Sequence, residues 1–142
     1  MAARADSILD NAVIVPRTVE AAATVAIGEV VKDGDADHEC APIAAVTDKP
    51  VAVVVSLGKL AGAAGDEVMV ALLTGGAVVP VRLGGTATRG FPAKYDTTAG
   101  RVGDATVSEA TPSVTWSPGW FTQSGVAGDF VGLAIARHYL TE

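Results

Sequence analysis

The sequence predicts an all-β fold in which two related β-units form a sandwich or barrel behind an N-terminal arm. Three observations support this. Short runs rich in Val and Ala follow one another at about ten-residue spacing. Clusters of Gly, Asp and Thr separate these runs, as tight turns require. The small-residue turn and apolar run at residues 62–73 also recur at residues 125–136.

The repeat defines the expected domain organisation. Four residues recur at a shift of 62, as Thr24/Thr86, Gly28/Gly90, Lys32/Lys94 and Pro50/Pro112. Six more recur at a shift of 63, beginning with Gly62/Gly125 and including Gly65-Asp66 against Gly128-Asp129. We therefore expect an arm at residues 1–20 and a single β-domain at residues 21–142, built from repeats at about 24–73 and 86–136.

The strands are predicted in order from β-branched content and bounding turns. Pro80 lacks the N–H that a sheet ladder needs, so its strand is expected at an edge or a bulge. The predicted strands are Val25–Val31, Pro42–Thr47, Val51–Leu57, Glu67–Leu73, Ala77–Leu83, Gly90–Tyr95, Ala105–Val107, Ser113–Trp116 and Phe130–His138.

Two segments are candidates for contact with a partner protein. The arm lies outside the repeat and carries Ile8, Leu9, Val13, Ile14 and Val15. We therefore expect it to dock on a neighbouring subunit or on a larger assembly of another protein. The second segment holds Trp116, Trp120 and Phe121, where the first copy has residues 54–58. These aromatic side chains either fill the core of the second unit or form a contact patch.

Composition excludes several classes of function. With 142 residues and a net charge of −6, the chain fits one domain and has no basic excess for nucleic acid. Cys40 is the one cysteine, so no internal disulfide is possible. The most apolar run, at residues 51–57, is too short to span a bilayer. Asp6 and Asp10 interrupt any secretory signal.

No catalytic, cofactor or metal site is expected, and the chain is predicted not to be an enzyme. Residues 33–37 alternate Asp as a calcium loop does, but His38 and Ala44 stand where an EF-hand needs Gly and Glu. His38 and Cys40 are too few for a zinc site. The glycine-rich segment at residues 84–90 lacks the Gly-Lys-Ser/Thr ending of a phosphate loop.

The chain resembles the tailed-phage capsid decoration proteins, also called cement or head-fibre base proteins. The motifs that carry this resemblance are residues 63–68, 83–90 and 125–130. The resemblance implies an all-β protein, made in the host cytoplasm, that binds the major capsid protein on the outside of the virion and stabilises it. It also implies a homotrimer, with no nucleic-acid or membrane partner. A tail or head–tail connector component remains an alternative, as does a small-molecule-binding β-barrel or enzyme whose site the sequence does not reveal.

Overall fold

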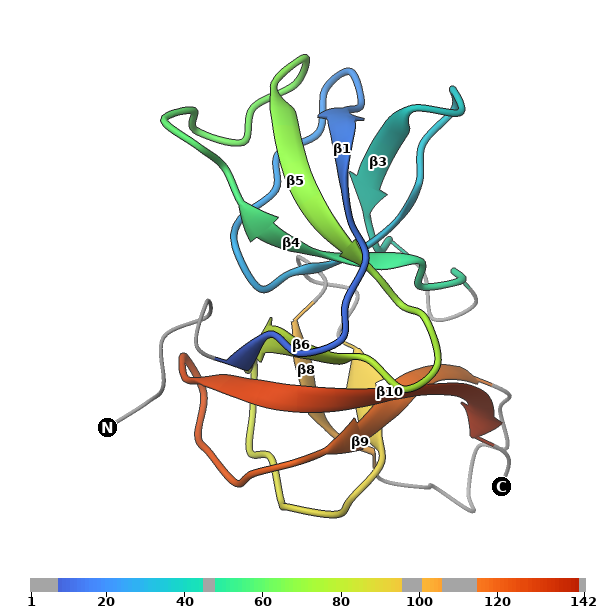
Figure 1. Ribbon diagram of the computed structural model, residues 1–142, viewed down its shortest axis with the longest axis vertical. Helices are drawn as coiled ribbons and strands as arrows, with labels where there is room; N and C mark the ends of the chain where they lie inside the picture. The colour runs from blue at the N-terminus through green and yellow to red at the C-terminus, as the bar shows by residue number, and fades with distance from the viewer. Residues whose placement is uncertain (1–7, 45–47, 96–100, 106–114, 141–142) are drawn as a thin grey trace.

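The computed structural model describes residues 8–44, 48–95, 101–105 and 115–140, and every element named within them is a β-strand (Figure 1). This confirms the predicted all-β class. The strands are β1 (Ile14–Val19), β2 (Val30–Asp33), β3 (Glu39–Pro42), β4 (Ala52–Ser56), β5 (Glu67–Leu72), β6 (Val78–Arg82), β7 (Ala93–Tyr95), β8 (Val102–Asp104), β9 (Thr115–Phe121) and β10 (Phe130–Leu140).

The first five strands form a closed barrel in the order β1-β3-β2-β4-β5, which is the upper part of Figure 1. Most neighbours pair antiparallel, as hairpin-connected strands do. The exception is the short parallel ladder between β1 and β3. β1 thus closes the ring by contacting β3 on one side and β5 on the other.

The last five strands repeat this arrangement more loosely. β6, β10 and β9 form one sheet, and β7 pairs with β8. A parallel bridge joins Leu83 to Val102, and an antiparallel bridge joins Pro92 to Trp120. These two bridges complete the order β6-β8-β7-β9-β10, which matches the first barrel strand for strand. The fold is therefore one five-stranded unit used twice.

The two Gly-Asp dipeptides occupy equivalent turns, as the sequence repeat predicts. The Gly65 amide donates to the Val19 carbonyl at 2.8 Å, and the Gly128 amide donates to the Leu83 carbonyl at 2.8 Å. Both glycines have a positive φ, 85° and 91°, which a residue with a side chain rarely adopts. Each turn delivers the chain into a long strand, β5 in the first unit and β10 in the second.

The repeat begins earlier than the sequence identities indicated. Because β1 is equivalent to β6, the units start near residues 14 and 78 rather than at Thr24 and Thr86. Pro16 and Pro80 occupy equivalent positions in β1 and β6. In both strands the proline nitrogen points away from the antiparallel neighbour, so its missing N–H removes no hydrogen bond from that ladder. The edge position expected for Pro80 is confirmed, because β6 is the outer strand of its sheet.

The predicted arm at residues 1–20 is wrong for its second half. Residues 14–19 form β1, a wall of the first barrel, and Asp10 exchanges two backbone hydrogen bonds of 2.9 Å with Val78. A proline usually disfavours a strand, but Pro16 fits β1 because its nitrogen points away from β5. Residues 1–7 lie outside the described part of the chain.

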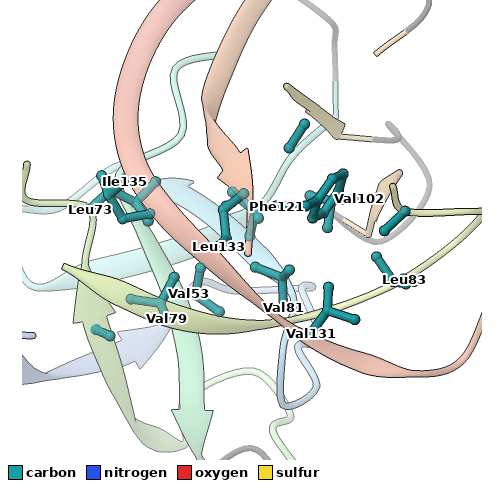
Figure 2. Packing of buried hydrophobic residues seen from close by; sticks show 14 of the residues in the cluster. Val53, Leu73, Val79, Val81, Leu83, Val102, Phe121, Val131, Leu133 and Ile135 are labelled. Carbon is teal, nitrogen blue, oxygen red and sulfur yellow. The ribbon is translucent and has the colours of Figure 1, made fainter. Parts of the chain in front are cut away.

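Two apolar clusters hold the fold together. One fills the first barrel, and its buried members are Val19, Val25, Val31, Cys40, Ala52, Val54, Val68 and Val70. The other, the shared core, spans both units and is shown in part in Figure 2; its buried members are Val30, Ile43, Val53, Ala71, Leu73, Ala77, Val79, Val81, Leu83, Ala87, Ala93, Val102, Phe121, Val131, Leu133 and Ile135.

Alternate residues along the strands of the first barrel belong to the two different clusters. Side chains of successive strand residues point to opposite faces, so Val31 and Val54 enter the barrel. Val30, Val53 and Ala71 point outward into the shared core, and each is 0% exposed. Figure 2 shows Val53 beside Val79 and Val81 of β6. Strands buried on both faces need nearly continuous apolar sequence, which explains the run at residues 51–57.

Two predicted strands are misplaced because of local turns. The run Val25–Val31 is not one strand, since the chain turns at Gly28, whose φ is +84°, and β2 starts at Val30. β3 ends at Pro42, where the predicted strand Pro42–Thr47 begins, because pairing with β2 starts soon after the turn at residues 33–37. Residues 45–47 of that prediction lie outside the described part of the chain.

Two later predictions fall partly outside the described residues. In place of Ala105–Val107 the strand β8 lies at residues 102–104, and residues 106–107 are not described. β9 begins two residues into the predicted strand Ser113–Trp116, whose residues 113–114 are not described.

The aromatic segment does not align with residues 54–58 as the constant shift predicted. Val54 faces Val70 across the β4–β5 ladder, whereas Phe121 faces Leu133 across the β9–β10 ladder. Since Val70 and Leu133 are equivalent, Phe121 is the counterpart of Val54. The second unit therefore carries extra residues between β8 and β9, which the identities could not locate.

The two equivalent turns should respond alike to the same substitution. The Asp66 carboxylate accepts the Ala63 amide at 2.9 Å, and the Asp129 carboxylate accepts the Val126 amide at 3.0 Å. We expect Asp66→Ala and Asp129→Ala each to lower the free energy of unfolding by about 1 kcal/mol, the usual value of such a bond. The corresponding Asn variants should keep most of this stabilisation. Chemical denaturation measures both pairs, and a large loss at only one turn would contradict their equivalence.

Candidate partner-contact surface

The structure separates the aromatic residues that were predicted together. Phe121 is 2% exposed and lies in the shared core, which is the core-filling alternative expected for this segment. Trp120 is the next residue on β9, and alternation turns it outward, where it is 43% exposed. Trp116 lies earlier on β9, where its backbone faces Tyr139 of β10. One of the three therefore fills the core and one reaches the surface.

The apolar residues of the predicted arm also divide. Ile8 and Leu9 are half-buried, and Leu9 packs against the shared core. Val15 packs against the core of the first barrel. Only Val13 and Ile14 are open, at 50% and 37% exposure. Most of this segment belongs to the fold of its own chain.

The second unit presents an aromatic face, defined here as Arg89, Phe91, Pro92, Lys94 and Trp120. The backbone bridge joins Pro92 to Trp120, and Lys94 follows two residues later on the same side of the strand. Phe91 is 50% exposed and lies next to this bridge. Arg89 and Lys94 are also exposed, so the segment that holds Phe91 and Pro92 carries two cations.

The aromatic face corresponds to a surface that is covered in the first unit. Trp120 is the counterpart of Val53, and Pro92 is the counterpart of Val30, because both pairs bridge the same two strands. Val30 and Val53 are completely buried between the units. The duplicated strand face is therefore used for internal packing once and is exposed to solvent the second time.

Phe91 is not among the contact residues predicted from the sequence, although the alignment of the two repeats indicates it. Gly28-Glu29 aligns with Gly90-Phe91, so a buried carboxylate in the first copy is replaced by an exposed phenyl ring in the second. Aromatic residues, Phe included, are enriched at protein–protein interfaces, so this replacement favours a contact surface in the second copy.

The residues considered for catalysis or metal binding do not converge. His38 is exposed, whereas Cys40 is buried, and burial raises the pKa of the Cys40 thiol. A raised pKa keeps the thiol protonated, which is unfavourable for a nucleophile. Within the described part of the chain, no group of three His, Cys, Asp or Glu side chains is placed to hold a metal ion.

An open groove of about 560 Å³ lies beside β2 and β3. Its polar side chains are Glu20, Thr24 and Lys32, and the rest of the lining is Ala, Pro and Ile. The Lys32 ammonium is already paired with the Asp48 carboxylate at 3.1 Å. The groove thus offers little convergent chemistry to a small ligand.

The fold is one five-stranded β-unit used twice. It is similar to the solved structure of the head fiber gp8.5 N base in bacteriophage phi29, with a TM-score of 0.64 and 19% sequence identity. The match covers 92% of this chain and 99% of that chain, so the whole architecture is shared. No family model matches the chain, and no curated protein matches it. No helix among the described residues is long and apolar enough to cross a membrane.

The neighbouring aromatics predict opposite mutational effects. Phe121→Ala should lower the free energy of unfolding by about 3–5 kcal/mol, because it empties part of the shared core. Trp120→Ala should cost below about 1 kcal/mol, because much of the indole remains in water. Thermal and chemical denaturation of the two variants measure the difference. Equal losses would place Trp120 in the core as well.

Proposed function

We propose that this protein is a structural component of a phage virion that binds the outer surface of the capsid and stabilises it. Its partners are the major capsid protein and further copies of itself, in a homotrimer, and it acts without a cofactor or catalytic step. The observation that carries the proposal is the likeness of its whole fold to a phage head fiber base. The aromatic face supplies a surface suited to protein contact.

The physical role follows from linkage. A protein that binds only the assembled shell stabilises the shell by mass action. Many copies on a symmetric lattice add modest contacts into a large collective effect. The chain carries a net charge of −6, so it would be repelled by an acidic partner surface unless the contact region is locally positive. Arg89 and Lys94 are exposed cations on the segment that holds Phe91 and supply positive charge there.

Self-association is part of the same proposal. The core consists mostly of Ala and Val, which bury little area each at about 25 cal/mol per Å². Contact between copies would bury additional apolar surface. Val13 and Val126 are large apolar side chains that remain at least half exposed on one chain, and they are candidates for this contact between copies.

We predict that purified protein binds undecorated capsids of its phage and raises the temperature at which they lose their DNA. Trp120→Ala and Phe91→Ala should weaken binding at least about tenfold, in line with aromatic hot spots. Leu60→Ala, which removes an equally exposed side chain from the first unit, is the matched control and should bind normally. Cosedimentation and imaging of the particles measure both.

Two outcomes would count against the proposal in different ways. If the unaltered protein does not bind capsids, the proposed function is wrong. If it binds and the two aromatic variants bind equally well, the function stands but the aromatic face is not the contact surface.

A further inference from the structure

The groove beside β2 and β3 lies where the parallel pairing of β1 with β3 gives way to an open wall. At this end of the pairing, the Glu20 amide donates to the Cys40 carbonyl at 3.0 Å. Alternate residues of a strand direct their main-chain polar groups toward the same neighbour, so the next residue of β3 on this side is Pro42. Proline has no N–H to donate, so it offers this side of the groove only its carbonyl oxygen.

The second unit shows how the same place is closed when a donor is present. The Gly84 amide donates to the Val102 carbonyl at 2.9 Å, which is the bond equivalent to that of Glu20. Two residues after Val102, the Asp104 amide donates to the Thr86 carbonyl at 2.9 Å, so the two segments stay paired. The opening in the first barrel is therefore a local departure from the duplicated pattern.

An insertion on the opposite rim widens the groove. The segment at residues 20–24 is two residues longer than its equivalent at residues 84–86. It contains a turn in which the Ala23 amide donates to the Glu20 carbonyl at 3.1 Å. Ala22 in this turn has a φ of +65°, a conformation that residues with a Cβ rarely adopt. Such backbone strain persists where the surrounding structure holds it, and it is frequent at ligand-binding sites.

The shape of the groove suits the main chain of an extended peptide. Its two rims are segments of main chain that the equivalent strands of the second unit join by hydrogen bonds. The Pro42 carbonyl can accept an N–H from an added strand, which is how strand addition provides affinity. Small side chains leave room for this close approach, since four of the lining residues are Ala22, Ala23, Ala41 and Ala44.

The charges at the groove favour a basic side chain on that peptide. The Lys32 ammonium is neutralised by the Asp48 carboxylate at 3.1 Å. The Glu20 Oε1 accepts the Asp35 amide at 2.9 Å, which fixes this carboxylate at the rim and leaves its second oxygen for another donor. The first unit, at residues 14–77, also holds nine acidic but only four basic residues, so its field attracts cations.

We propose that this groove binds an extended segment of a partner protein by strand addition, with a lysine or arginine of that segment on Glu20. The main chain of the segment donates to the Pro42 carbonyl, and its cation bonds to the second oxygen of the Glu20 carboxylate. The groove belongs to the first unit and the aromatic face to the second, so this site is separate from the proposed capsid contact.

The test titrates the full chain with two short peptides of equal length, in which alanine alternates with lysine in one and with glutamate in the other. The lysine peptide should produce saturable NMR shifts at the amides of residues 22–24 and 41–44, and the glutamate peptide should not. Glu20→Gln keeps an acceptor for the Asp35 amide but loses the charge, so it should weaken binding about two- to fivefold, as for an exposed ion pair.

Two further variants separate the groove from general attraction to an acidic protein. Glu67→Gln is the matched control, because it removes the same charge from an exposed position of β5 outside the groove, and it should bind normally. Ala44→Phe introduces a ring at an exposed residue of the groove lining. It should abolish the saturable shifts while leaving the melting temperature nearly unchanged.

Three results would overturn the inference. The first is the absence of saturable shifts with the lysine peptide. The second is equal weakening by Glu20→Gln and Glu67→Gln, or full binding by Ala44→Phe, because either would show that the peptide does not occupy the groove. The third is a loss of self-association in Ala44→Phe, measured by analytical ultracentrifugation, which would assign the groove to a second copy of the chain.

Discussion

Burial of the first barrel's strands on both faces is the constraint on which the rest of the structure depends. Val31 and Val54 fill the barrel, while Val30 and Val53 pack into the core that both units share. Small side chains, mostly Val and Ala, form this thin wall between two cores. This agrees with a composition of 49% hydrophobic residues but only 5% aromatic residues. The same wall also holds the two units together, because its outward side chains pack against the apolar side chains of the second unit.

Duplication followed by divergence accounts for the different surfaces of the two units. Equivalent strands carry Val53 in one unit and Trp120 in the other, and equivalent turns carry Glu29 and Phe91. The first member of each pair is buried, and the second is exposed. One strand face therefore packs inside the molecule, whereas its copy faces solvent.

The sequence predicts the features that depend on local chemistry. It does not predict the features that depend on which strands pair with each other. The all-β class and the equivalent Gly-Asp turns follow from turn residues and apolar periodicity. β1 was missed because Pro16 looks like a stop until its neighbour strand is known, although Pro80 marks the same place in the second copy. The aromatic face could not be assembled from sequence, because only the bridge from Pro92 to Trp120 brings its two segments together.

The central claim is that the two units share one core and therefore unfold together. Differential scanning calorimetry of the full chain tests this most directly, because it compares the calorimetric enthalpy with the van't Hoff enthalpy. The account predicts a single transition in which the two enthalpies agree. Two resolved transitions, or a van't Hoff enthalpy near half the calorimetric value, would show that the barrels are independent and would contradict the account.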